Sequence, residues 1–161
     1  MERQGIMKAL TAPMQQLGEF EEILRKIRTN RGVLQVSGCI DPQKPHFISC
    51  AAEGYDCRLI ITYSDLRARE LYENYRFFDR DVLYFPAKDL IFFQADIHSN
   101  LLEQQRIAVL KALAEQENVT VITTMAACMN HLMPSDSWQK QVLTFAPGDV
   151  LDMEAMKSTL V

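Results

Sequence analysis

The chain has 161 residues, of which 48% are hydrophobic and 24% are charged, and its formal net charge is −4. These values are typical of one globular domain with a well-filled core and exclude a disordered chain. The acidic balance disfavours autonomous nucleic-acid binding, because Lys and Arg supply most of the non-specific affinity for phosphates. No apolar run approaches the roughly 20 residues that span a bilayer, and MERQGIMKAL lacks the apolar core of a secretory signal.

Helical and strand-like patterns alternate along the chain. A helical stripe lies between Pro13 and Gly32, and helical patterns recur near 45–53, 64–78, 98–116 and 125–132. Short β-rich runs lie at 33–37, 58–63, 82–86, 119–124 and 141–145. Ser64 is placed to cap the helix that follows it. This alternation predicts an α/β fold with right-handed crossovers and a mostly parallel sheet covered by helices on both faces.

The end of the sequence predicts one more helix. Met153, Met156 and Leu160 are spaced at i, i+3 and i+7, as on one face of a helix. Nothing follows for that face to cover, so we interpret the chain as a fragment of a longer protein.

The four cysteines give no sign of a metal or disulfide framework. Cys39, Cys50, Cys57 and Cys128 are separated by 11, 7 and 71 positions, without a CxxC pair. That spacing fits neither a zinc site nor a small disulfide scaffold. We predict buried, reduced thiols in a cytoplasmic protein, and no metal site.

The segment VLQVSGCIDPQKPHFIS (33–49) places a loop between a predicted strand and a predicted helix, as in a phosphate-binding loop of the pattern GxxxxGK[ST]. Registered on Gly38 and Lys44, the pattern has Gln43 at its second glycine and Pro45 at its hydroxyl position. Asp41 adds a negative charge where an anion would lie. Pro45 still suits the first turn of a helix, so the local strand–loop–helix geometry is expected to survive.

These changes remove the chemistry of phosphate binding. Pro42 and Pro45 have no N–H to donate, and we expect them to push Asp41 and Lys44 towards extended conformations. Gln43 would be strained at the positive φ that glycine takes freely. Two lost donors to a charged group cost roughly 3–6 kcal/mol, or about 10²–10⁴ in affinity. We therefore predict a degenerate nucleotide loop that holds no cofactor.

Three longer stretches carry a family resemblance: YFPAKDLIFFQADIHSNLLEQQRIAVLKAL (84–113), ITYSDLRARELYENYRFF (61–78) and VTVITTMAACMNHLMP (119–134). Together they resemble the N-terminal region of the bacterial transcription-repair coupling factor (Mfd) family, a module homologous to the excision-repair protein UvrB. The resemblance implies a P-loop, RecA-like fold, similar to the first subdomain of UvrB, with a degenerate nucleotide loop. It also implies a first subdomain at 1–137 and the truncated start of a second at 138–161.

Members of that family displace RNA polymerase stalled at DNA lesions with an ATP-driven translocase and recruit the repair protein UvrA. The motors that use ATP and Mg²⁺ are absent from this chain, and the UvrA contacts lie mainly beyond its end. The resemblance thus implies a non-catalytic scaffold that contacts other domains of the parent protein, reaches RNA polymerase and DNA through it, and has no membrane partner. The alternative is a divergent P-loop ATPase or helicase-type domain.

Arg106 falls on an apolar helical stripe, where an unpaired charge is costly. The stripe is made by Leu102, Val109, Leu110 and Leu113. Because Asp89 and Asp96 lie just upstream, we predict that one of them pairs with Arg106 and holds the loop to the helix. The alternative role is that of an arginine finger, which requires a nucleotide site. No catalytic residue is predicted.

Overall fold

The computed structural model describes residues 11–29, 32–88, 96–115 and 118–134 and shorter stretches between 136 and 160, without the side chains of residues 96–100, 155 and 158–160. The chain divides into two compact units, Met1–Asn130 and His131–Val161. The first unit holds the sheet, and the second contains α8 (Met153–Leu160), the helix expected from the methionine spacing. The division at 137 and 138 that the family resemblance implies stays a prediction.

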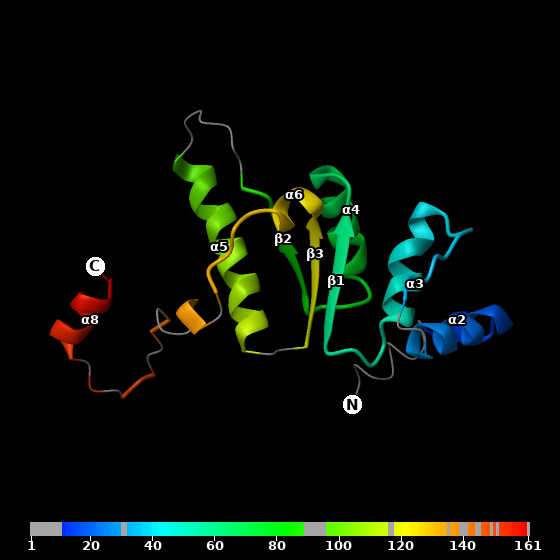
Figure 1. Ribbon diagram of the computed structural model, residues 1–161, viewed down its shortest axis with the longest axis horizontal. Helices are drawn as coiled ribbons and strands as arrows, with labels where there is room; N and C mark the ends of the chain where they lie inside the picture. The colour runs from blue at the N-terminus through cyan, green and yellow to red at the C-terminus, as the bar shows by residue number, and fades with distance from the viewer. Residues whose placement is uncertain are drawn as a thin grey trace. The chain divides into compact units, whose positions relative to one another are not determined.

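The first unit is an α/β structure built on three parallel strands. They are β1 (Cys57–Thr62), β2 (Val82–Phe85) and β3 (Val119–Thr124), in the order β1-β3-β2 (Figure 1). Leu59 lies opposite Val121 in one pair, and Leu83 lies opposite the same residue in the other. The strands predicted at 58–63, 82–86 and 119–124 and their parallel arrangement are therefore confirmed.

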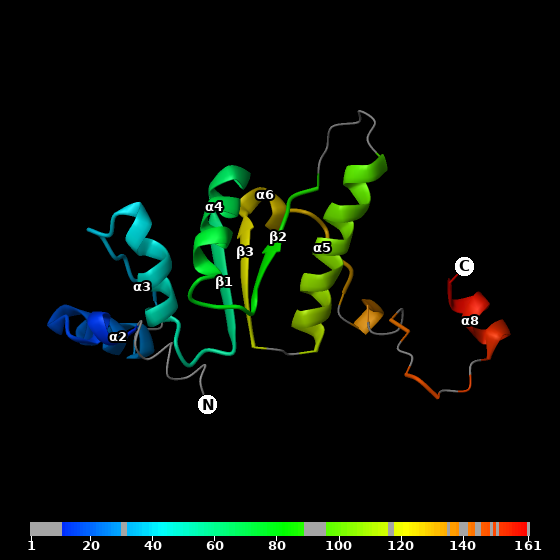
Figure 2. The same ribbon diagram turned by 180° about the vertical axis from the view of Figure 1, so that it is seen from behind.

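Two helices pack on opposite faces of this sheet. On one face α4 (Asp65–Tyr75) packs against Ile122 of β3 (Figure 2). On the other face α5 (Asp96–Ala114) packs against Val121, the neighbouring residue along β3. Side chains alternate between faces along a strand, so these two contacts require helices on both sides. The Ser64 hydroxyl accepts a hydrogen bond from the N–H of Arg67 at 3.3 Å, which confirms the predicted cap of α4.

Helices also precede β1 in the described part of this unit. It contains α2 (Gly18–Thr29), the short 3₁₀ helix η1 (Asp41–Gln43) and α3 (Lys44–Ala51). Phe20 of α2 meets Phe47 of α3 edge to face, with ring centroids 5.8 Å apart. Ile48 of α3 packs against the apolar cluster of α4, so α3 lies on the α4 face of the sheet. The helix that follows β3 is α6 (Met125–Cys128).

One expected strand is not found, and another falls mostly outside the described residues. Residues 33–37 form no strand, and 97% of Val33 is exposed. Residues 142 and 143 are also outside any strand, and 141, 144 and 145 lie outside the described residues. The prediction at 33–37 is wrong for this structure: β-branched composition creates only a tendency, and these residues pair with no neighbouring strand.

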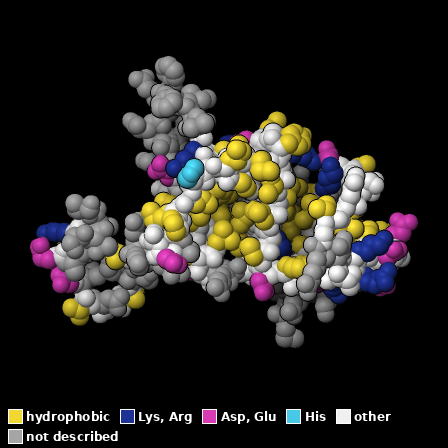
Figure 3. Space-filling view, viewed as in Figure 1, with side chains coloured by type: hydrophobic (Ala, Val, Ile, Leu, Met, Phe, Trp, Pro, Cys, Tyr) yellow, Lys and Arg dark blue, Asp and Glu magenta, His cyan; other side chains and the backbone are white. Residues whose placement is uncertain are grey.

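The covering of the sheet is also less complete than expected. Cys57, Leu59 and Ile61 point to the α5 face of β1, and all three are exposed. Helix α5 covers that face only over β2 and β3, which leaves the β1 side chains bare. Hydrophobic side chains gather in Figure 3 where Figure 1 places β1 and β3. We call Cys57, Leu59 and Ile61 the bare face of β1.

The prediction that the four cysteines are buried is only partly correct. Cys50 is buried, Cys39 is half-buried, and Cys57 and Cys128 are exposed. Cys57 is exposed because it belongs to the bare face of β1.

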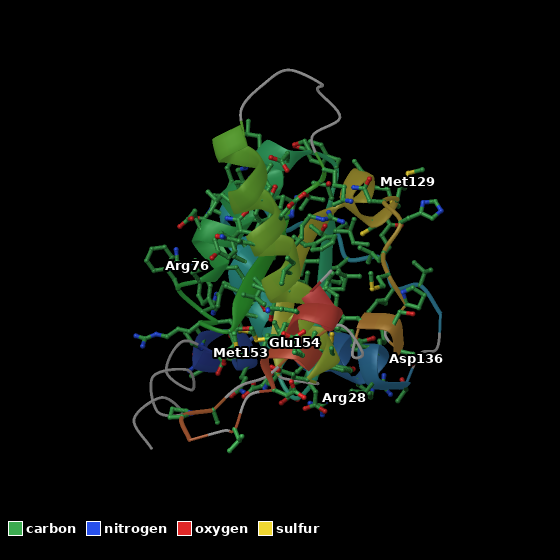
Figure 4. All side chains as sticks on the ribbon, turned by 90° about the vertical axis from the view of Figure 1, so that its left-hand side faces the viewer. Arg28, Arg76, Met129, Asp136, Met153 and Glu154 are labelled. Atoms are coloured by element: carbon green, nitrogen blue, oxygen red, sulfur yellow. The ribbon has the colours of Figure 1, made fainter. Side chains whose placement is uncertain are left out.

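Met129, which follows α6, is 77% exposed, and its side chain points away from the ribbon (Figure 4). In the part of the chain that the structure describes, no helix is long and apolar enough to cross a membrane.

Candidate functional site

The loop predicted to be a degenerate phosphate site adopts a right-handed helical path. Gly38 has a φ of +95°, but Gln43 has −85° and Lys44 has −55°. Asp41 belongs to η1 and Lys44 begins α3, so the extended conformations expected for these two residues are wrong. The helical region is disfavoured before proline but not forbidden, and hydrogen bonds within the turn hold the chain there.

The backbone donors of residues 42–45 are absent or already used. Pro42 and Pro45 have no N–H. The N–H of Gln43 donates to the carbonyl of Ile40 at 3.0 Å, and the N–H of Lys44 donates to the carbonyl of Asp41. A phosphate nest needs successive N–H groups that converge on one anion. Residues 42–45 offer no such group, and Pro45 is buried in the first turn of α3.

The ammonium of Lys44 is bound to a carboxylate of the same loop. Lys44 Nζ lies 2.6 Å from Asp41 Oδ1, and Nη2 of Arg67 lies 3.2 Å from the same oxygen. The hydrogen bond from Lys44, followed by the charge of Arg67, lowers the pKa of Asp41 below its usual value. Arg67 also reaches Glu70 at 3.1 Å. Asp41 therefore meets the two cations as a bound anion would.

Arg67 is the part of this site that the sequence did not reveal. Its position three residues after the capping Ser64 places it in the first turn of α4, and nothing in that local pattern points to the loop. The contact with Asp41 depends on the packing of α3 against α4. It joins two segments that are separated along the chain by the whole of β1.

A cavity of about 720 Å³ lies beside the loop, between α2, residues 36–39 and α3. Its walls are mainly apolar and include Leu17, Phe20, Val36 and Phe47. We call it the loop pocket. Among the described residues that line it, Glu19 is the one acid and no Lys or Arg is present. Its size and lining suit an apolar group, because ligand pockets are mostly apolar cavities of roughly 300–1,000 Å³.

Arg106 is buried, as the helical stripe implied. Only 5% of the residue is exposed, and burial lowers the pKa of its guanidinium. Nη1 donates to the carbonyl of Pro86 at 2.6 Å, and the guanidinium carbon lies 4.1 Å from the ring centroid of Phe85. Residue 89 and the side chain of Asp96 lie outside the described residues, so the expected ion pair stays a prediction. Arg106 thus fastens α5 to the chain just after β2.

A second polar cluster lies at the amino ends of the strands. Asp79 Oδ2 accepts a hydrogen bond from the Thr120 hydroxyl at 2.6 Å and lies 3.6 Å from Nη2 of Arg58. Tyr75 is fully buried nearby, and burial raises its pKa. In open α/β sheets ligands bind at the carboxyl ends of the strands. We therefore interpret this cluster as a clamp that holds the loop before β2 to the sheet.

Within the described residues no group of three His, Cys, Asp or Glu side chains could hold a metal ion. Neither a protein-family model nor a curated protein matches the sequence. The fold and the site define a small α/β domain with an open, three-stranded parallel sheet. In the loop before α3, the N–H of Gln43 and the ammonium of Lys44 are already bonded to groups of the same loop.

Proposed function

We propose that the chain is a non-catalytic scaffold domain that acts through contacts with other protein segments. The observation that carries this proposal is the state of the loop at 41–45. Asp41 binds the ammonium of Lys44, and no backbone N–H of residues 42–45 is available to an anion. A phosphate would have to displace that carboxylate and would still lack the donors of a nest.

The larger setting of the proposal comes from the sequence resemblance. The chain is proposed to be the first part of the UvrB-like module of a cytoplasmic transcription-repair coupling factor. In that setting it derives from a RecA-like motor whose nucleotide loop has degenerated. Its partners are the remaining domains of the parent protein, which bring it to UvrA and to RNA polymerase stalled at DNA lesions. Parallel strands with helical crossovers are compatible with such a motor ancestry.

A calorimetric titration with Mg-ATP tests the absence of a nucleotide site. We expect no binding heat and no phosphate release. Lys44→Ala should leave both readouts unchanged, as should the control Lys26→Ala, which breaks a comparable exposed ion pair with Glu22 at 2.8 Å. Binding or turnover that is lost in Lys44→Ala and kept in Lys26→Ala would establish the alternative, a divergent P-loop ATPase.

A salt-dependent gel shift with duplex DNA tests direct nucleic-acid binding. The net charge of −4 leads us to expect no shift at low salt. A complex at low salt that dissociates steeply as salt is added would indicate phosphate contacts by Lys and Arg. That result would replace the scaffold proposal with a DNA-binding role.

A further inference from the structure

Two neighbouring cavities lie along α4. The first, of about 350 Å³, is lined by residues of α4, β2 and α5, and the second, of about 390 Å³, lies at the end of α4. Figure 2 shows β2 between the two helices. Glu73 lines both cavities, so they adjoin, and we call the pair the α4 groove. The α4 groove shares no described lining residue with the loop pocket.

The charge of the α4 groove is opposite to that of the chain. Among the described residues that line it, Arg69, Arg76 and Arg80 are basic. Glu73 is the one acid among them, so three positive charges against one negative give a local charge of +2. The whole chain has a net charge of −4. A basic surface favours encounters with acidic partners and suppresses those with basic ones.

Aromatic rings hold two of these arginines in place. The guanidinium carbon of Arg76 lies 5.4 Å from the ring centroid of Tyr72, and that of Arg69 lies 5.8 Å from the centroid of Tyr84. A guanidinium that is already oriented loses less freedom when it binds a carboxylate. Phe77, which lines the second cavity, is 80% exposed. Arginine and aromatic side chains of this kind supply much of the binding energy in protein interfaces.

The internal ion pairs of the α4 groove are exposed, so a partner can exchange them. Nε of Arg69 lies 3.0 Å from Oδ2 of Asp65, and Nη1 of Arg76 lies 3.4 Å from Oε2 of Glu73. All four side chains are exposed in these pairs. Exposed ion pairs contribute little to stability, because water screens the charges and both side chains lose freedom. A carboxylate of a partner can therefore replace them at little cost.

We propose that the α4 groove binds an acidic peptide segment of a partner protein. Carboxylates of the segment pair with Arg76 and Arg80, and one apolar side chain enters the first cavity against Tyr72 and Leu102. A nucleic acid is the other polyanion to consider, but phosphate binding needs a longer row of Lys and Arg than this surface offers. The inference rests on the proposed function, since a scaffold acts through contacts with other protein segments.

Fluorescence anisotropy of labelled peptides, added to the whole chain, tests the proposal. The probe is a pool of short peptides in which a tryptophan, leucine or phenylalanine is flanked by aspartate and glutamate. The control pool has lysine at the flanking positions, and an oligonucleotide of thymidines tests for nucleic-acid binding. We expect the acidic pool to bind at least about ten-fold more tightly than the lysine pool. Its affinity should fall as salt is added, because salt screens exposed charges.

Exposed residues provide variants that leave the fold intact. Arg80→Glu should weaken binding of the acidic pool by about ten-fold, whereas Arg28→Glu, the same charge reversal at an exposed position of α2, should not. Phe77→Ala should weaken binding several-fold. Its control is Leu17→Ala, since Leu17 is 54% exposed and lines the loop pocket. Circular dichroism should be the same for all four variants.

A fifth variant should improve binding. Glu73→Gln removes the one acid among the described lining residues and releases Arg76 from its ion pair. We expect the acidic pool to bind this variant several-fold more tightly than the unaltered chain. Damage to the fold would weaken binding, so an increase in affinity reports on the charge of the α4 groove itself.

Four results would overturn the proposal. The acidic pool does not bind, or binds no better than the lysine pool. Arg28→Glu weakens binding as much as Arg80→Glu, or Leu17→Ala as much as Phe77→Ala. Glu73→Gln does not strengthen binding. The oligonucleotide alone binds and loses its affinity in Arg80→Glu, which would make the groove a nucleic-acid site. None of these variants alters the loop at 41–45, so the Mg-ATP titration decides the proposed function separately.

Discussion

Replacement of Arg106 by alanine tests whether its buried contacts hold α5 to the end of β2. The substitution removes a hydrogen bond to the carbonyl of Pro86 and a guanidinium stacked on Phe85. It also leaves space where the buried side chain packed. We expect a lower free energy of unfolding, although the charge no longer has to be desolvated.

The magnitude follows from those contacts. A hydrogen bond to a charged group contributes about 1.5–3 kcal/mol, and a desolvated cation–π contact contributes up to about 2. Relief of the desolvation penalty offsets part of this sum. We expect a net loss of about 2–4 kcal/mol for Arg106→Ala. Arg106→Lys keeps the charge but loses the planar stack, so its loss should be smaller.

Urea unfolding followed by circular dichroism measures the effect, and thermal unfolding provides a second readout. For a chain of this size each kcal/mol lowers Tm by about 2–4 °C. Lys111→Ala is the matched control on the same helix, because Lys111 is exposed and lies 3.8 Å from Glu115. It should change stability by less than about 0.5 kcal/mol. If Arg106→Ala were no worse than Lys111→Ala, the anchoring role of Arg106 would be refuted.

Three other predictions use local contacts of the first unit. Ser64→Ala should lower the free energy of unfolding in urea by about 0.5–2 kcal/mol, because it removes the cap of α4. The control Thr29→Ala, at the exposed end of α2, should lower it by less than about 0.5 kcal/mol, and equal losses would contradict the capping role. Burial raises the pKa of Cys50 to about 11, so iodoacetamide at neutral pH should label the exposed Cys57 before Cys50. Mass spectrometry measures the two labelling rates, and equal rates would contradict the burial of Cys50. Burial, followed by a hydrogen bond to a carboxylate, raises the pKa of Tyr84 from 10.0 to about 12, so the free energy of unfolding should fall as pH rises through that range. It should fall less in Tyr84→Phe, and equal dependence on pH in the two proteins would refute this linkage.

Local signals in the sequence were sufficient for the three strands, the cap at Ser64 and the helix at 153–160. Each depends on periodicity or on contacts within a few residues. The loss of phosphate donors was also predictable, since Pro42 and Pro45 lack an N–H in any conformation. The conformation of the loop was not predictable, because hydrogen bonds within η1 overcame the local preference of a residue before proline.

Tertiary structure alone decided the partners of the charged groups. The carboxylate of Asp41 meets Arg67, and the guanidinium of Arg106 meets the carbonyl of Pro86, because packing brings distant segments together. Packing also decided that residues 33–37 form no strand, although their composition is that of a strand. A strand is stabilised by hydrogen bonds to a neighbour, and no local pattern states which edge will be free to accept it.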